Sequence, residues 1–155
     1  TMKRILIALT AVLFAMLPAS AQSAKNSSAD NIIGKYESVQ GTDAYKVEVS
    51  KNEDGTYKAQ IYWMKDPMDP KTGKKALDVK NPDKSLRTRP CDQIVLIQNL
   101  KYLSAKKVWG DAKIYDPQRG IKANVTAQFL PDGRLSLKAT VLGIGETVYW
   151  TPVEK

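Results

Sequence analysis

The segment from Ile121 to Val141, IKANVTAQFLPDGRLSLKATV, decides the fold class. Apolar and polar side chains alternate along residues 121–129, and they alternate again from Arg134 to Val141. This period of two is typical of half-buried β-strands, and the Pro-Asp-Gly at 131–133 supplies turn residues between the two runs. The sequence therefore predicts an antiparallel hairpin with one apolar face.

The same pattern continues on both sides of this hairpin. Residues 45–49, YKVEV, and 56–64, TYKAQIYWM, predict a second hairpin around NEDG, and their alternation puts Trp63 on the same face as Ala59 and Ile61. Two further strands are predicted from KKVWGDAKIYD and ETVYWTPV, whereas the continuous apolar run of QIVLIQNL suits either a strand or a short helix. Ordered structure is expected from Ile32 onward.

Together these segments predict an all-β domain of about eight or nine short strands joined mostly by tight turns. Consecutive hairpins with one apolar face can close into a small antiparallel up-and-down β-barrel, which removes the exposed sheet edges. A two-sheet sandwich is the structural alternative. The inward rows mix alanines with large aromatic residues, so the pattern leaves open whether the interior is filled or hollow.

The first residues have the pattern of a secretory signal peptide. Lys3 and Arg4 precede an apolar run of 13 residues, Ile5–Leu17, and Ala-Ser-Ala at 19–21 fits a cleavage site. The run is too short for a membrane-spanning helix, which needs about 20 residues. We predict a signal peptide over residues 1–21 (Thr1 is interpreted as a cloning remnant), a flexible leader over 22–31 and one barrel domain over 32–155. The protein is expected to be exported, to the periplasm or outside the cell.

Composition excludes several kinds of site. The chain of 155 residues contains no histidine, which removes Ser-His-Asp and Cys-His catalysis and histidine-ligated metals. Cys91 is the single cysteine, so an internal disulfide cannot form, and a buried, inert thiol is expected. The net charge of +8 comes without a basic helix or a stacking motif, and nucleic acid is therefore not expected as a partner.

One long segment interrupts the strand pattern and is the first place to look for a site. Residues 65–90 contain four prolines, and their eight Lys and Arg against four Asp make a net charge of +4. Within them, NPDKSLRTRP at 81–90 opens on Asn81, which suits an Asx turn. Arg87 and Arg89 are two residues apart, so in an extended stretch they would face one way and could hold a carboxylate or phosphate. The alternative is that these arginines bind structural carboxylates or backbone carbonyls.

Aromatic residues with a polar atom are the other candidate ligand contacts. They suit a pocket that is mostly apolar with a few oriented donors, although each can equally serve ordinary core packing. The aromatic candidates are Trp63, Trp109, Tyr115 and Trp150.

Five segments resemble, in order, a bacterial exported family catalogued as domain of unknown function 2147. They are IIGKYES, GTYKAQIYWMK, NPDKSLRTRP, KKVWGDAKIYDPQRG and LGIGETVYWTP, and they span about Ile32 to Pro152. The resemblance implies a lipocalin-like (calycin) barrel that binds a ligand of unassigned identity. Gly34-Lys35-Tyr36 is similar to the Gly-x-Trp that opens lipocalin barrels, with tyrosine in place of tryptophan.

These observations lead to one functional hypothesis and one alternative. The hypothesis is an exported protein, not an enzyme, that holds a small hydrophobic or amphipathic molecule, with or without an anionic head, in its barrel. Neither a cofactor nor a metal is expected, and a weak homodimer is left open. The alternative is a cell-envelope interaction protein whose barrel is packed solid.

Overall fold

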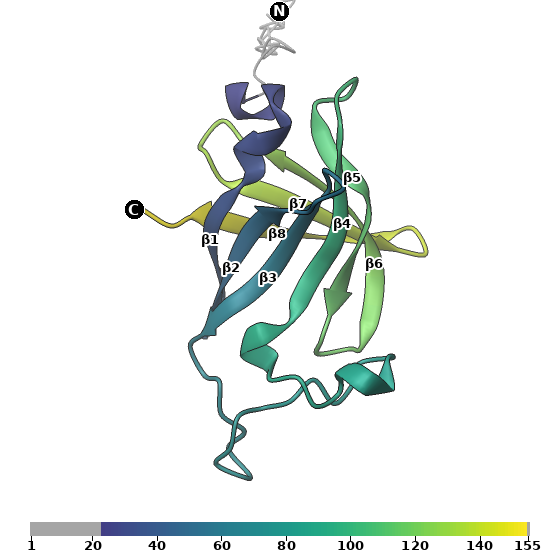
Figure 1. The fold of residues 1–155 in the computed structure, drawn as a ribbon. Helices are drawn as coiled ribbons and strands as arrows, with labels where there is room; N and C mark the ends of the chain where they lie inside the picture. Colours follow the sequence, from purple (N-terminus) through teal and green to yellow (C-terminus); the bar gives the residue numbers. More distant parts are fainter. Residues whose placement is uncertain (1–22, 155) are drawn as a thin grey trace, which may run out of the picture.

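The computed structural model describes residues 23–154 and shows a closed barrel of eight antiparallel strands joined in sequence order (Figure 1). The up-and-down barrel predicted from the alternating pattern is confirmed. The predicted signal peptide over residues 1–21 lies outside the described residues. The strands are β1 Gly34–Gln40, β2 Asp43–Lys51, β3 Tyr57–Met64, β4 Val95–Leu103, β5 Val108–Asp116, β6 Ile121–Phe129, β7 Leu135–Val141 and β8 Ile144–Pro152.

The hairpin of β6 and β7 shows how alternation builds the wall. Ala127 lies opposite Leu137, and Phe129 lies opposite Leu135. All four side chains are buried, whereas Thr126 and Gln128 between them are exposed. Because successive side chains in a strand point to opposite faces, a single register places the apolar rows of both strands inside over this stretch.

A β-bulge changes the face of Trp63. Between β2 and β3, Val47 pairs with Ile61 but Lys46 pairs with Trp63, so Tyr62 is an extra residue in β3. An extra residue reverses the alternation beyond it. Trp63 therefore lies outside the barrel, 40% exposed, with the Lys46 Nζ 5.0 Å from its ring centroid. The prediction that Trp63 shares the inward face of Ala59 and Ile61 is wrong for this reason.

The N-terminal segment closes one end of the barrel with two short 3-10 turns, η1 Ala24–Ser27 and η2 Ala29–Ile32 (Figure 1). Asn26 is fully buried there, and its side chain bonds both backbone groups of Phe129, donating to the carbonyl at 2.9 Å and accepting from the N–H at 2.7 Å. The described part of the segment predicted as a flexible leader, residues 23–31, thus forms two short turns and has one buried polar anchor, Asn26.

Large aromatic residues fill the interior next to this closed end. Trp109 meets Phe129 edge to face at 5.7 Å between ring centroids, and Tyr36 lies 6.3 Å from Trp150. The Trp109 Nε1 donates to the carbonyl of Ala29 at 3.0 Å, so the tryptophan also holds the N-terminal segment in place. This half of the barrel is therefore a packed core.

Candidate functional site

The long loop between β3 and β4 lies at the opposite end of the barrel from the N-terminal turns (Figure 1). Tyr115 pairs with the exposed Lys122, which puts its side chain on the outside of β5. The loop nevertheless buries it, and the Tyr115 hydroxyl donates to Asp78 Oδ1 at 2.6 Å. Burial, helped by this hydrogen bond, raises the pKa of Tyr115 above its usual range. Tyr115 is therefore an anchor for the loop.

Asn81 and Arg87 complete the same anchor. The buried Asn81 donates from Nδ2 to Asp78 Oδ2 at 2.7 Å, and its Oδ1 accepts from the N–H of Asp83, which is the expected Asx turn. Arg87 donates from Nε to the carbonyl of Asn81 at 2.7 Å. The structure thus brings Asn81, Arg87 and Tyr115 together, and the chain itself bonds the Asn81 amide, the Arg87 Nε and the Tyr115 hydroxyl.

Arg87 and Arg89 do not lie in an extended stretch. Residues Lys84–Leu86 form a 3-10 turn, η3, which begins where Asp83 accepts a hydrogen bond from the N–H of Ser85, and Arg87 itself is helical at φ −68 and ψ −14. The two-residue spacing therefore does not make the guanidinium groups parallel, because that inference required strand geometry. The geometric argument for two arginines aimed at one anion therefore fails at Arg87, and contact of Arg87 or Arg89 with a ligand stays a prediction.

Cys91 is half-buried and is the first residue of the 3-10 turn η4, Cys91–Gln93, which precedes β4. Burial raises the pKa of its thiol, and the carboxylates of Asp78 and Asp92 add to the effect. Because the thiolate is the reactive form, this environment favours an inert thiol.

The other predicted aromatic residues have separate places. Trp109 and Trp150 lie in the core, and the Trp150 Nε1 donates to the Tyr45 hydroxyl at 3.1 Å. Trp63 lies on the outer surface. None of these three lines either of the two hollows described below.

The hollow that we consider the better candidate site lies between the first and last strands, β1 and β8, where the barrel closes. Within the described residues, β1 and β8 pair at just Tyr36–Pro152 and Glu37–Thr151, while β1 runs on to Gln40 and β8 begins at Ile144. Between the two diverging edges is an open hollow of about 410 Å³. Its lining comes from these two strands: Ser38, Val39, Gln40, Glu146, Thr147, Val148 and Tyr149.

Ser38 is the unusual member of this lining. Its register with Tyr45 follows the inward row of Tyr36, and the side chain is 1% exposed. Its Oγ has no hydrogen-bond partner among the described residues. A buried hydroxyl without a partner is costly, because folding removes its bonds to water without replacing them. Ser38 therefore adds to the lining of the hollow a residue whose buried hydroxyl has unused hydrogen-bonding capacity.

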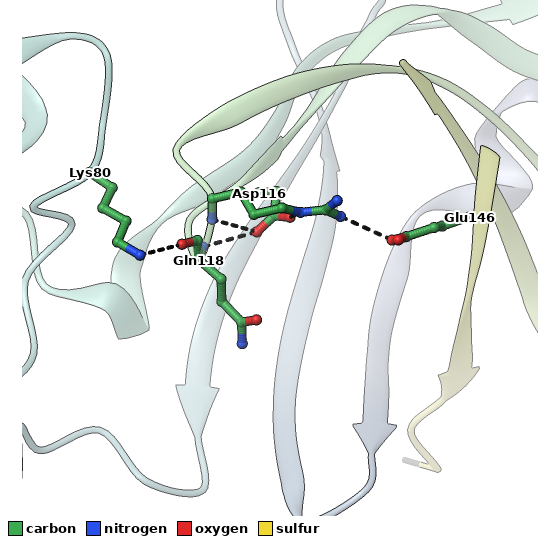
Figure 2. Close-up of polar contacts among 5 residues, drawn as sticks. Lys80, Asp116, Gln118 and Glu146 are labelled. Carbon is green, nitrogen blue, oxygen red and sulfur yellow. Dashed lines mark hydrogen bonds and ion pairs between the residues drawn. The ribbon is translucent and has the colours of Figure 1, made fainter. Parts of the chain in front are cut away.

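A chain of polar contacts reaches the same hollow from the long loop (Figure 2). The Lys80 Nζ donates to the carbonyl of Gln118 at 2.7 Å. In the same β5–β6 turn, Arg119 bonds Asp116 at 2.6 Å and reaches Glu146 of β8 at 3.0 Å. Both ion pairs are substantially exposed, so each contributes little to stability. Arg119 is thus a cation at the edge of the hollow that can exchange partners at low cost.

Gly120 lets this turn sit close to the loop. Its φ is +66, and a Cβ at this position would collide with the carbonyl oxygen of Lys80. Glycine alone meets both conditions without strain. The close contact holds the β5–β6 turn, which carries Arg119, against the long loop.

A second hollow, of about 480 Å³, lies outside the barrel near the β2–β3 turn. It is shallower and lined mainly by polar residues such as Asn52, whose Nδ2 donates to the carbonyl of Gln98 at 2.8 Å. Because the side chains of Asn52 and Asp54 bond groups in and beside the turn, we treat it as a weaker candidate site. Among residues 23–154, no cluster of acidic or cysteine side chains could hold a metal ion.

Sequence reasoning missed Ser38, Val148, Glu146 and Arg119. If the alternation of β1 is extended from Tyr36, Ser38 falls in the inward row. If the alternation of β8 is extended back from Trp150, Val148 and Glu146 fall in the inward row. The divergence of β1 from β8 has no comparable signal, because it depends on how the barrel closes.

The comparisons with known proteins agree with this architecture. Residues 34–152 match the family described as "Uncharacterized protein conserved in bacteria", domain of unknown function 2147. The chain belongs to this family. A solved structure of the Helicobacter pylori protein HP1028, described as belonging to the lipocalin family, is similar at a TM-score of 0.62 and 22% identity, over 79% of this chain and 83% of that one. This likeness shows the lipocalin-like fold. No curated protein sequence matches the chain.

Proposed function

We propose that this family member is an exported binding protein, not an enzyme, that holds a small, largely apolar molecule in the hollow between β1 and β8. One observation carries the proposal: Ser38, which lines the hollow, has a buried hydroxyl without a hydrogen-bond partner among the described residues. A ligand that bonds Ser38 would offset the cost of burying it. The lipocalin-like fold supports a binding role, and the pattern of residues 1–21 supports export.

The lining indicates an amphipathic ligand. Val39, Val148 and Tyr149 offer apolar surface, while Ser38 and Glu146 offer polar groups within the same hollow. Small-ligand sites commonly combine an apolar wall with a few polar groups that fix orientation. If the ligand has an anionic head, Arg119 is better placed to meet it than Arg87, whose Nε is bonded within the long loop.

The test is the binding of N-phenyl-1-naphthylamine, an uncharged apolar dye whose fluorescence rises in apolar sites. We expect the dye to bind the wild-type protein saturably and decanol to displace it. In Ser38→Ala, the affinity for decanol should fall roughly fivefold, as expected for the loss of one hydrogen bond. Because the variant removes an unsatisfied buried group, its thermal stability should not fall. Ser50→Ala, on the neighbouring strand and outside the hollow, is the matched control and should change neither quantity.

The head group is tested by comparing decanoate with decanol as displacing ligands. Arg119→Gln should weaken decanoate severalfold and leave decanol unchanged, because only the carboxylate gains from a guanidinium. Equal effects on both would remove the anionic head from the proposal without affecting the Ser38 contact.

The second candidate is an envelope interaction protein with a packed barrel, and the aromatic filling near the N-terminal turns favours it. Binding of the dye distinguishes the small-molecule proposal from the packed-barrel candidate. If wild-type protein binds neither dye nor decanol, the small-molecule proposal is wrong and the packed-barrel candidate is preferred.

A further inference from the structure

The turn between β7 and β8 exposes aliphatic side chains at the tip of a hairpin. Leu142 is 98% exposed, and Val141 and Ile144, which form the last pair of the ladder, are 37% and 78% exposed. In Figure 1 this turn projects beyond the neighbouring strands. The aliphatic tip, defined here as Val141, Leu142 and Ile144, therefore presents apolar surface at a protruding point of the molecule.

Leu142 is also poorly suited to its backbone. It has φ +50 and is followed by Gly143 at φ +79, so both central residues of the two-residue turn have positive φ. Such turns favour Asn-Gly or Asp-Gly, and a bulky residue in this region is uncommon and strained. Leucine at this position is thus unfavourable both for the turn and for solvation. The fold offers no packing that compensates, which indicates a role outside the fold.

The surface beside the tip is basic. The side chain of Lys138 lies against Gly145, the residue that follows Ile144. Lys113 shares the outer face, in the cross-strand row that runs through Asn124 and Thr140 to Gly145. Lys122 is exposed on the same wall, facing the Asp83 carboxylate. The other carboxylates at this end, Asp116 and Glu146, are already paired with Arg119.

We propose that the aliphatic tip docks on an anionic lipid bilayer, with the tip in the headgroup region and Lys113 and Lys138 near the lipid phosphates. Apolar side chains gain by leaving water at the bilayer interface, and nearby lysines add attraction to negatively charged lipids. The net positive charge of the chain favours the same surface. Among residues 23–154, no helix has the length and hydropathy to cross a bilayer.

The binding of vesicles to the full folded chain tests this inference independently of any ligand in the barrel. Wild-type protein should co-sediment with vesicles of phosphatidylethanolamine and phosphatidylglycerol, and much less with phosphatidylcholine alone. Leu142→Asn should lower the partition coefficient roughly tenfold, as the loss of several buried carbons predicts. Lys138→Gln should weaken binding and reduce its dependence on salt.

Leu142→Asn separates a docking role from a structural one. Asparagine suits positive φ, so the variant should keep or raise the midpoint of thermal unfolding while binding is lost. Val79→Asn is the control, because Val79 is 64% exposed on the long loop, and it should leave vesicle binding unchanged.

Two results would overturn the inference. One is equal vesicle binding by wild-type and Leu142→Asn protein. The other is self-association in sedimentation equilibrium that Leu142→Asn abolishes, without vesicle binding by the wild-type chain, since the tip would then contact a second copy.

Discussion

At the closed end of the barrel, Asn26 and Trp109 are buried with their polar atoms hydrogen-bonded to the backbone. At the open end, Ser38 is equally buried without a partner, β1 leaves β8, and Leu142 is nearly fully exposed in a strained turn. Satisfied polar groups and packed aromatic residues stabilise a fold, whereas unsatisfied and exposed groups reduce its stability. We propose that one end of this barrel maintains the structure and that the other makes contacts with other molecules.

The largest effect should come from truncating the aromatic core. Trp109→Ala removes a fully buried side chain that fills the barrel and bonds Ala29, and it should cost about 3–5 kcal/mol of unfolding free energy in urea titrations. Trp63→Ala should cost about 1 kcal/mol or less, because Trp63 is partly exposed and packs mainly with Lys46. Equal losses of unfolding free energy in the two variants would contradict the outward position that the β-bulge gives Trp63.

The next effect tests the N-terminal closure. Asn26→Ala leaves the N–H and carbonyl of Phe129 buried without their partner, and it should destabilise the protein by about 2–3 kcal/mol. Asn31→Ala, whose side chain bonds the exposed carbonyl of Lys25, should cost less than about 1 kcal/mol. If the two variants unfold at the same urea concentration, the segment is not an integral part of the barrel.

A third test uses alkaline pH. Burial, together with the hydrogen bond to Asp30, raises the pKa of Tyr57 to about 12 from 10.0. The folded state therefore favours the neutral phenol, and the stabilisation is complete below pH 10 and is lost as the pH rises toward 12. The difference in unfolding free energy between wild-type and Tyr57→Phe protein should shrink between pH 8 and 11. A constant difference would show that Tyr57 is not buried in this way.

The smallest effect concerns Arg87. Removing its hydrogen bond to the Asn81 carbonyl in Arg87→Ala should cost about 1 kcal/mol of stability and leave dye and decanoate affinities unchanged. A tenfold loss of decanoate affinity in a folded Arg87→Ala protein would instead support the original prediction of an arginine-based anion site on the loop.

Alternation predicted the barrel well because it reports which face of each strand is apolar. It located the hairpin of residues 121–141 and the strands that carry Trp109 and Trp150. It failed at Trp63, because one extra residue in a strand reverses every following side chain and leaves no mark in composition. Residues 22–31 were predicted to be flexible because they are polar, although the polar side chain of Asn26 bonds the buried backbone of Phe129.

The candidate site was harder to predict, since it depends on contacts between distant segments. Asn81 and Arg87 of the long loop do come together with Tyr115 of β5, but Asp78 and the Asn81 carbonyl bond the Asn81 amide, the Tyr115 hydroxyl and the Arg87 Nε. The hollow at Ser38 and Glu146 arises from incomplete pairing of the first strand with the last. Such closure depends on the tilt and stagger of all eight strands, which no local pattern encodes.

The central claim, that the open end is the binding end, is tested most directly by following the backbone amide NMR signals of isotope-labelled protein during titration with decanol. We predict saturable shifts concentrated at residues 38–40 and 146–149, with the amides of 24–32 and of Trp109 unmoved. Shifts confined to residues 52–54 and 95–99 at the outer hollow, or no saturable shift at all, would contradict the claim.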